Sequence, residues 1–541
     1  MTVPRHRVAQ FITWGVLALV ILFVAAIRIR LLALPLERDE GEYACTGQLL
    51  LHGIPPYKLA YTMKLPGTGA AYAAIMAIFG QTSAGIHLGL LLLNAATIVM
   101  VFLLARHLLD DLGALVAATT FALLSVSPAV YGTAAHTEHF VLLPALAGFL
   151  ALFRALERDR RWMIFLTGLL FGLAFLMKQS GIFFGIFGGV YLAYQELRGR
   201  RAPGCHGLAI KAALFSLGAV LPFALVCLAL YLTGVFPAFW FWTFSYAREY
   251  AGMESLDQAL DHFTSGFEYV TLSGRFLWIL AGLGIIQFGL SWKAWPKAGF
   301  MAGLLLFSFL AVCPGFYFRN HYFILLLPAV GIAAGLMVNS AQSWFPGTTP
   351  YRFVPVAVFI AVWAYSVVQQ SNLLLRLPPA RVCRLVYRAN PFPEAVEIAR
   401  YLKAHSTKDE TIAVLGSEPE ICFYADRRSA TGYIYTYPLM EPQSYALPMQ
   451  QQMIHEIETA KPAWVVMVRI GASWDKRPRS NTLIFDWFFN HYSPENLETV
   501  GVIDIVSLTQ TDYYWQAEGR PMPPRSEFYV EIFKRKSAVV K

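Results

Sequence analysis

Acidic residues stand directly after the first apolar run of the chain, at Asp39, Glu40 and Glu42. A carboxylate is costly beside hydrocarbon, so acids held at this boundary indicate a functional site. Lys64 follows them and precedes an apolar segment, residues 68–79, which is too short to cross a bilayer and is typical of a helix lying along the membrane surface. The carboxylates could accept a proton and the lysine could hold an anion, all within one shallow pocket. The alternative is that these are solvated loop charges.

A second polar group opens a later apolar run, where Glu138 lies between His136 and His139. A helix dipole stabilises a carboxylate at its N-terminus, so capping is an alternative to substrate binding here. Lys178 lies in a short turn between two further apolar runs, where it would either reach the interface as an anchor or bind an anion. We expect the anion, because this turn falls on the same side as the acids.

A third group, residues 317–322, precedes another apolar run and contains Tyr317, Arg319 and His321. An arginine can contact a phosphate through two parallel hydrogen bonds, to which histidine and tyrosine can add. An aromatic belt with one interfacial arginine is the alternative. Residues 240–250 are also rich in aromatic side chains, which suit lipid headgroups or the flat face of a sugar. Together the groups could displace a phosphate leaving group with a hydroxyl nucleophile.

The composition predicts the elements that must position these residues. The 541 residues are 57% hydrophobic and only 14% charged, with a mean hydropathy of +0.50, far from the composition of soluble domains. We therefore expect a polytopic α-helical membrane protein with about eleven transmembrane helices. The first apolar run lacks a small-residue cleavage site and is expected to remain as a membrane span. The expected spans are residues 11–34, 84–105, 112–130, 138–156, 162–178, 180–196, 208–233, 274–291, 299–313, 321–339 and 353–370.

Basic residues cluster in the short loops between alternate apolar runs, which accounts for the net charge of +9. Positive loops stay in the cytoplasm, so this pattern reflects topology and argues against nucleic acid as a partner. The acids, the Lys178 turn and the Arg319 segment then lie together on the opposite face. The six cysteines have neither zinc-type spacing nor a disulfide pattern.

The composition changes beyond the last apolar run. Residues 1–375 form the expected transmembrane domain, and residues 380–541 are expected to form an α/β accessory domain on the same face as the acids. No glycine-rich phosphate loop follows its first strand, so no nucleotide site is expected. The predicted strands are residues 411–415, 464–468, 500–506 and 528–533, and the predicted helices are residues 393–404 and 450–460.

These motifs, in this order, resemble the bacterial branch of the dolichyl-phosphate-mannose-protein mannosyltransferase family. The residues that carry the resemblance are Arg38 to Ala44, Lys64-Leu65-Pro66, Thr137-Glu138 and Tyr317 to Tyr322. Relatives of that family include the lipid A aminoarabinose transferases, and all share the C-type glycosyltransferase fold. The resemblance covers roughly residues 1–370, and Leu65 stands where the family usually has proline.

The resemblance implies an integral-membrane glycosyltransferase that moves a sugar from a polyprenyl-phosphate donor to an acceptor hydroxyl, with inversion at the anomeric carbon. It also implies a bacterial inner (cytoplasmic) membrane location among membrane lipids, with the reaction and the accessory domain on the periplasmic face. The acceptor would be a lipid, a glycan or a protein. Asp39 would be the general base, with Glu40 as its neighbour or substitute. The donor phosphate would be bound by Lys64, Lys178, Arg319 and His321, and the substrates would be contacted by Glu42, Tyr43, Glu138 and Tyr317.

Two other functional classes are open on the sequence. A transporter or flippase of a lipid-linked sugar would also use membrane charges, but it should place them near mid-bilayer and in repeated halves. A non-catalytic membrane subunit would use its C-terminal domain to bind a partner. No cofactor is indicated, although the acids could hold a divalent cation without any diagnostic spacing.

Overall fold

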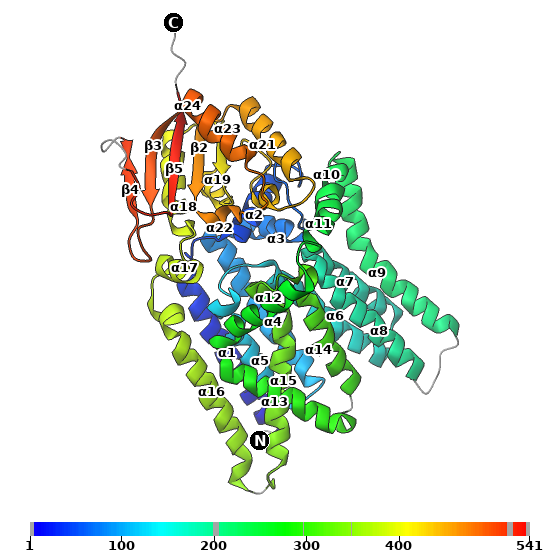
Figure 1. The fold of residues 1–541 in the computed structure, drawn as a ribbon. Helices are drawn as coiled ribbons and strands as arrows, with labels where there is room; N and C mark the ends of the chain where they lie inside the picture. Colours follow the sequence, from blue (N-terminus) through cyan, green and yellow to red (C-terminus); the bar gives the residue numbers. More distant parts are fainter. Residues whose placement is uncertain (1–4, 199–204, 296, 348, 517–522, 537–541) are drawn as a thin grey trace.

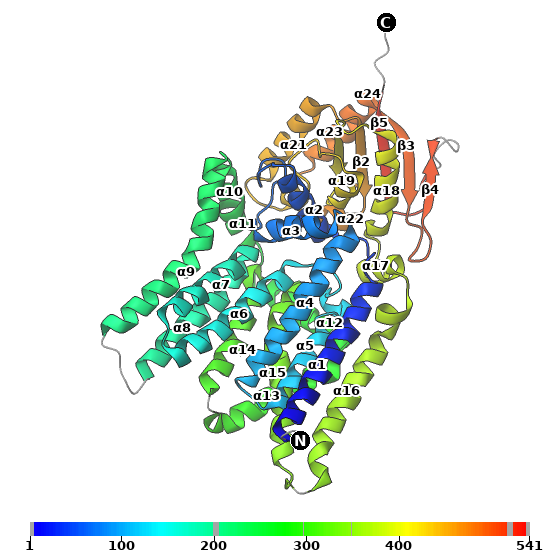
Figure 2. The ribbon, with the colours of Figure 1, turned by 180° about the vertical axis from the view of Figure 1, so that it is seen from behind.

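The computed structural model describes residues 5–198, 205–295, 297–347, 349–516 and 523–536. A bundle of long helices carries a small sheet domain at one end, and the first helix begins at the opposite end (Figure 1). The same arrangement seen from behind shows the first and last long helices side by side (Figure 2). The sheet domain therefore lies on one side of a helical layer.

Each of the eleven predicted spans coincides with a helix. Within the described residues, six helical stretches are long and apolar enough to cross a membrane. A seventh is added if α12 (Leu256–Leu272) and α13, which are bent by 113° against each other, form one span. The chain is therefore a multi-pass membrane protein, while the count of eleven crossings remains a prediction. The eleven helices are α1 (Arg5–Arg30), α4 (Ser83–Arg106), α5 (Asp111–Leu124), α6 (Thr137–Arg158), α7 (Arg161–Met177), α8 (Ile182–Arg198), α9 (Cys205–Leu232), α13 (Arg275–Ser291), α14 (Ala298–Val312), α15 (Leu327–Ser343) and α16 (Val354–Ser371).

Small residues let the buried helices approach closely. A Cβ atom on Gly335 of α15 would lie 2.2 Å from the carbonyl oxygen of Gly113 in α5, and one on Gly331 would lie 2.5 Å from that of Ala117. Association of helices in lipid depends on such close packing, because lipid tails are as apolar as leucine. This contact joins α5 to α15, and most residues of both helices are buried.

Two short helices lie where the bundle meets the sheet domain (Figure 1). The first, α2 (Arg38–Leu51), begins with a reciprocal pair: the Glu37 carboxylate accepts a hydrogen bond from the amide of Glu40, and the Glu40 carboxylate accepts one from the amide of Glu37. The second, α3 (Gly67–Phe79), is the short apolar helix expected from the sequence.

Residues 234–273 lie between two of the expected spans and are largely helical. They contain α10 (Phe236–Trp240), a π-helical turn at Phe241–Tyr246, α11 (Ala247–Ala251) and α12. The remaining short 3-10 and π turns are Pro128–Val130, Gln179–Gly181, Trp292–Ala294, Pro314–Phe316, Asn320–Leu326, Pro350–Phe353, Asn372–Arg376 and Phe488–Tyr492.

The C-terminal region contains a mixed five-stranded sheet of order β1-β2-β5-β3-β4. β1 (Ile412–Leu415) pairs in parallel with β2 (Trp464–Arg469), and the other pairings are antiparallel. The four predicted strands are present as β1, β2, β3 (Leu497–Asp504) and β5 (Tyr529–Arg535). The edge strand β4 (Asp512–Trp515) was not predicted, because it is short and its side chains are all half-buried. The helices of this region are α17 (Pro379–Tyr387), α18 (Phe392–His405), α19 (Glu420–Ala425), α20 (Tyr437–Met440), α21 (Ala446–Ala460), α22 (Gly471–Trp474), α23 (Leu483–Trp487) and α24 (Ser493–Asn496).

The sheet domain and the outer end of the bundle share a hydrophobic core. One buried cluster joins Tyr43 of α2 and Tyr72 of α3 to Ile412, Val466 and Ile532 of the sheet. Burial of this surface holds the acidic segment between the two regions. The domain division at residues 375–380 remains a prediction.

Candidate active site

Lys64 is the centre of the acidic group. Its Nζ lies 2.7 Å from Oδ1 of Asp39 and 2.6 Å from Oε2 of Glu42, and it lies 4.4 Å from the ring centroid of Tyr43. Burial would raise the pKa of Asp39, but the adjacent Lys64 ammonium outweighs it and holds that pKa well below its usual range. Asp39 is therefore ionised in its ion pair with Lys64.

Leu65 departs from the proline of the family that the motifs resemble, and the structure shows what holds the turn in this chain. The Leu65 side chain is 2% exposed and packs in a cluster with Tyr57 and Trp242. The Tyr57 hydroxyl donates a hydrogen bond of 2.8 Å to the carbonyl of Lys64. A Cβ atom at Gly67 would lie 2.3 Å from the carbonyl oxygen of Leu176. Packing and this close approach therefore set the position of Lys64.

Glu40 is fully buried and engaged on both oxygens. Its Oε1 accepts a hydrogen bond of 2.6 Å from the amide of Ala135 and lies 3.0 Å from Nε2 of His87, while Oε2 takes part in the cap at Glu37. Burial opposes ionisation of Glu40, yet His87 lowers its pKa below the usual value. The side chain of Asp39, by contrast, is 20% exposed. Asp39 is therefore the more accessible of the two acids, and Glu40 positions the turn around Ala135.

The carbonyl of Met177 joins the separate motifs. It accepts hydrogen bonds from the hydroxyls of Thr68, at 2.9 Å, and Thr137, at 2.7 Å. The side-chain amide of Gln179 donates to the carbonyl of Met63 at 2.8 Å. The Lys64 segment, the turn before α6 and the turn after α7 are thus held at one place, as the sequence predicted from topology alone.

Lys178 and Glu138 form an ion pair within this group. The Lys178 ammonium also lies 3.7 Å from the ring centroid of Tyr322, a cation–π contact. Nε2 of His321 lies 4.0 Å from Glu138 and 3.8 Å from Asp39. The charge of Lys178, like that of Lys64, is therefore balanced by a carboxylate.

Arg319 differs from the two lysines. It is exposed, and no carboxylate of the described residues lies within ion-pair distance of its guanidinium. The guanidinium lies 5.5 Å from the ring centroid of Tyr317, whose flanking residues Phe316 and Phe318 both have positive φ, 59° and 43°. Backbone strain of this kind is maintained where the surrounding structure enforces it, often at functional sites. Arg319 is therefore an open cation on a constrained turn.

Tyr317, expected to contact substrate, is buried. Its ring stacks on Tyr250 with centroids 4.5 Å apart, and its hydroxyl donates a hydrogen bond of 3.4 Å to the Tyr250 carbonyl. This contact fixes the Arg319 turn against α11. Because its hydroxyl is already bonded within the protein, we infer that Tyr317 positions the Arg319 turn.

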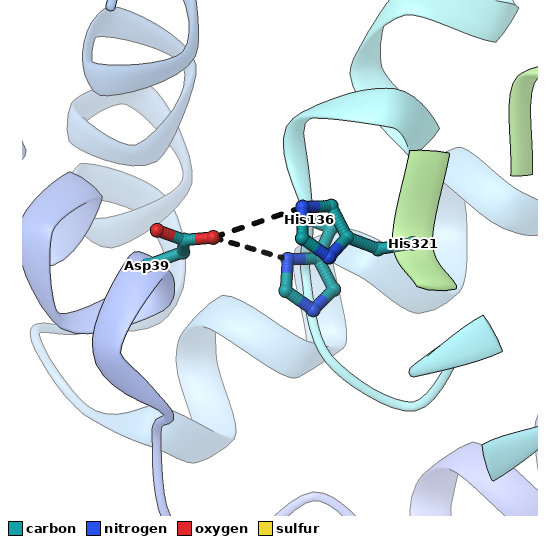
Figure 3. A group of neighbouring side chains, drawn as sticks. All are labelled: Asp39, His136 and His321. Carbon is teal, nitrogen blue, oxygen red and sulfur yellow. Dashed lines mark ion pairs between the residues drawn. The ribbon is translucent and has the colours of Figure 1, made fainter. Parts of the chain in front are cut away.

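Asp39, His136 and His321 form a compact group of metal-ligating type (Figure 3). Oδ2 of Asp39 lies 4.0 Å from Nδ1 of His136 and 3.8 Å from Nε2 of His321, and the imidazole rings stack with centroids 4.2 Å apart. The three residues come from α2, the turn before α6 and the 3-10 turn before α15. The sequence predicted each residue in a polar motif but not their grouping.

Several other residues that form the site were not identified from the sequence. Arg28 is buried and donates to Asn94 and to the carbonyls of Ser125 and Gly132, which fixes the turn before α6. Arg28, His87 and Asn94 interrupt predicted apolar runs, and this signal could have identified them. Arg38 is different, because its contacts lie in the C-terminal domain and nothing local indicates them.

Arg38 joins α2 to the sheet domain. Its guanidinium donates to the carbonyl of Ser417 at 2.8 Å, to Glu418 at 3.1 Å and to the Tyr437 hydroxyl at 3.0 Å. The buried charge is thus paired and hydrogen-bonded, as a buried arginine requires. The helix that carries Asp39 is therefore anchored to the accessory domain one residue away.

A second link to the sheet domain comes from residues 241–255. The Tyr246 hydroxyl donates a hydrogen bond to Glu441, and Arg477 lies 3.0 Å from Glu254. Burial raises the pKa of Glu441 to about 7. The link therefore contains a carboxyl group that titrates near neutral pH.

Replacing Glu441 with glutamine should change the pH dependence of stability. The folded protein holds the Glu441 proton more tightly than the unfolded chain, so this contribution is complete below the ordinary pKa of 4.5 and is lost as the pH rises through about 7. The full effect is on the order of 3 kcal/mol. The melting temperature in detergent should fall more between pH 5 and pH 8 for the wild type than for Glu441→Gln. The exposed Glu527→Gln variant should keep the wild-type slope, and identical slopes in all three proteins would contradict the assignment.

Comparison with known proteins adds independent information. The family model described as dolichyl-phosphate-mannose-protein mannosyltransferase matches residues 64–232. The solved structure of ArnT from Cupriavidus metallidurans bound to undecaprenyl phosphate is 16% identical, with a TM-score of 0.54 over 84% of this chain and 93% of that chain. The oligosaccharyltransferase AglB from Archaeoglobus fulgidus, in complex with an inhibitory peptide and a dolichol-phosphate, is 11% identical, with a TM-score of 0.52 over 95% and 75%. The chain has the C-type glycosyltransferase fold.

These matches confirm the fold class expected from the sequence and the resemblance drawn from its motifs. A further oligosaccharyltransferase structure from Archaeoglobus fulgidus, a complex with Zn and sulfate, shares this fold at 13% identity, with a TM-score of 0.53 over 91% of this chain and 72% of that chain. No curated protein matches the sequence. The matched segment includes Lys64, Glu138 and Lys178, whereas Asp39 and Arg319 lie outside it.

Proposed function

We propose that this protein is an integral-membrane glycosyltransferase that moves a sugar from a polyprenyl-phosphate donor to an acceptor hydroxyl, with inversion. The observation that carries the proposal is the pairing of one accessible carboxylate with one uncompensated cation at the same end of the bundle. Asp39 is ionised and partly exposed, and Arg319 is exposed without a carboxylate partner. His321 connects them, because it lies 3.8 Å from Asp39 and two residues from Arg319.

In the proposed reaction, Asp39 removes the proton of the acceptor hydroxyl as its oxygen attacks the anomeric carbon. The bond between that carbon and the phosphate oxygen breaks, and both of its electrons leave with the phosphate. Arg319 stabilises the negative charge that develops on the lipid phosphate. A single displacement of this type inverts the anomeric configuration. Lys178 and Lys64, balanced by Glu138 and Glu42, supply a smaller part of that field.

The lipid donor is supported by the solved structures with this fold. The ArnT structure is bound to undecaprenyl phosphate, and one AglB structure is bound to a dolichol-phosphate. We therefore propose a polyprenyl phosphate as the carrier and a lipid, glycan or protein as the acceptor. The location proposed for this reaction is the periplasmic face of a bacterial inner membrane, with the C-terminal domain in the periplasm. Charges that gather at one end of the bundle favour transfer over transport.

Asp39, His136 and His321 fit a divalent cation of the zinc type, because two imidazoles and a carboxylate leave an open fourth position. The opposite ring atoms, Nε2 of His136 and Nδ1 of His321, are buried without hydrogen-bond partners among the described residues. Within the described part of the chain, neither imidazole is therefore oriented by a hydrogen bond to its other nitrogen, which favours a weakly held ion over a structural one. When bound, such an ion would polarise an acceptor oxygen beside Asp39.

The proposal is tested with purified protein reconstituted in vesicles that contain a radiolabelled polyprenyl-phosphate hexose and a cell-envelope extract as acceptor. We expect label to move into the acceptor fraction, with one free polyprenyl phosphate released for each sugar transferred. Label that crosses the bilayer on an intact lipid would instead indicate a transporter. Retention of all label on the lipid without movement would also contradict the proposed transfer.

A further inference from the structure

Tyr435 brings the C-terminal domain into the candidate active site. It lies in the segment between β1 and α21, and its ring centroid is 5.6 Å from Nζ of Lys64. The ring centroid of Tyr43 also lies near that ammonium, at 4.4 Å. Lys64, the partner of Asp39, is therefore flanked by one aromatic ring from the membrane region and one from the accessory domain.

The hydroxyl of Tyr435 is free while its neighbours are engaged. Tyr433 donates to Gln452 at 2.9 Å, the Thr436 hydroxyl donates to the carbonyl of Ser473 at 3.3 Å, and Tyr437 donates to the carbonyl of Ala472 at 2.6 Å. Among the described residues, Tyr435 has no such hydrogen-bond partner, and its side chain is only half-buried. The anchored neighbours hold the segment that carries this free hydroxyl in place beside Lys64.

Tyr435 lies beside the carboxylate end of the proposed site, because its ring is 5.6 Å from the Lys64 ammonium that pairs with Asp39. The charges of Asp39, Lys64 and Arg319 all act on its hydroxyl. Burial, with Asp39 adding to it, raises the pKa of Tyr435 well above its usual value, so the hydroxyl remains a hydrogen-bond donor. The sugar of a lipid-phosphate donor must bind next to the base, and Tyr435 borders that region through Lys64.

Resting on the proposed function, we propose that Tyr435 is a sugar-contacting residue: its hydroxyl donates a hydrogen bond to an oxygen of the transferred hexose, so the accessory domain completes the donor site. The segment is tied to α2 through the bond between Arg38 and Tyr437. The contact between the domain and α2 therefore also positions Tyr435 at the sugar site. The C-terminal domain then contributes directly to sugar recognition.

The test compares Tyr435→Phe with wild type in binding and transfer. Two probes are used, a short-chain polyprenyl-phosphate hexose and the same polyprenyl phosphate without sugar. Loss of one hydrogen bond to the sugar should weaken binding of the sugar-loaded lipid, and lower kcat/KM for it, by about tenfold. Binding of the sugar-free lipid should stay within about twofold, because phosphate contacts are unchanged.

The matched control is Tyr433→Phe, which removes a hydroxyl two residues away that is bonded to Gln452 inside the domain. It should leave the preference for sugar-loaded over sugar-free lipid at the wild-type value. Equal binding of both probes by Tyr435→Phe and wild type, or an equal loss for both probes, would overturn the proposal. Tyr435→Phe could lose affinity only for the sugar-loaded lipid while neither wild type nor any variant transfers sugar. The Tyr435 contact would then stand and the proposed function would fail. If wild type and Tyr435→Phe transfer equally well, only the Tyr435 contact fails.

Discussion

The Asp39→Asn variant is expected to lose sugar transfer by about 10²–10⁴-fold, the usual contribution of a positioned general base. The change keeps the shape of the side chain but removes the charge that would take the acceptor proton. The fold should persist, because Lys64 keeps its 2.6 Å contact with Glu42 and the cap of α2 depends on Glu37 and Glu40. The measurement is the initial rate of label transfer from the lipid donor in vesicles, alongside the melting temperature in detergent.

Asp261→Asn is the matched control, because it makes the same chemical change at an exposed position of α12. It should transfer sugar at the wild-type rate. A wild-type rate in Asp39→Asn would show that another group accepts the proton. A collapse of its melting temperature would show that Asp39 holds the fold, and the base assignment would then lose its support.

The Arg319→Ala variant is expected to lower kcat/KM for the lipid donor by about 10²–10³-fold, as removal of one group that stabilises a developing anion does. Its effect should exceed that of Lys178→Ala, because Lys178 is already balanced by Glu138 whereas Arg319 has no carboxylate partner among the described residues. Arg319→Lys should recover part of the loss, since it keeps the charge but not the planar pair of donors. Steady-state kinetics over a range of donor concentrations measure each effect.

Arg275→Ala serves as the control for charge alone. Arg275 is exposed at the first residue of α13 and forms no ion pair with any of the described residues. Its loss should leave donor kinetics unchanged. Unaltered kinetics in Arg319→Ala would remove the phosphate role, and an equal loss in both arginine variants would assign the effect to general surface charge.

These expectations concern different steps of one reaction. Asp39 acts on the acceptor, Arg319 acts on the departing phosphate, and Tyr435 acts on the sugar between them. The three residues come from α2, from the turn before α15 and from the C-terminal domain. Loss of any one should leave the contacts of the other two intact, so the variants should be separable by acceptor, phosphate and sugar dependence.

The elements that carry the site were largely predictable. Long apolar runs identified the helices, because the composition of such a run is enough by itself to bury it in a membrane. Four of the five strands were identified for a similar reason, as their apolar runs are bounded by polar turns, and only the short edge strand β4 lacked that pattern. Acids and cations next to apolar runs also identified Asp39, Lys64, Lys178 and Arg319 as members of one face.

The roles of those charges were not predictable. Sequence treated Lys64, Lys178 and Arg319 alike, but the structure pairs Lys64 with Asp39 and Glu42, and Lys178 with Glu138. Each pair joins residues from different elements, so no local pattern specifies it. Asp39 and Glu40 were likewise equivalent as neighbours, until helical geometry turned Glu40 into the core and left Asp39 partly exposed.

By itself, the sequence determined that this is a multi-pass membrane protein with a C-terminal α/β region, and that its polar motifs belong to one face. Those properties follow from composition and from charge bias between apolar runs, which act residue by residue along the chain. Only the tertiary structure decided which cation is uncompensated, which acid is accessible, and that Tyr435 reaches Lys64 from the accessory domain. Those properties depend on distances between side chains that are far apart in the sequence, and only packing sets such distances.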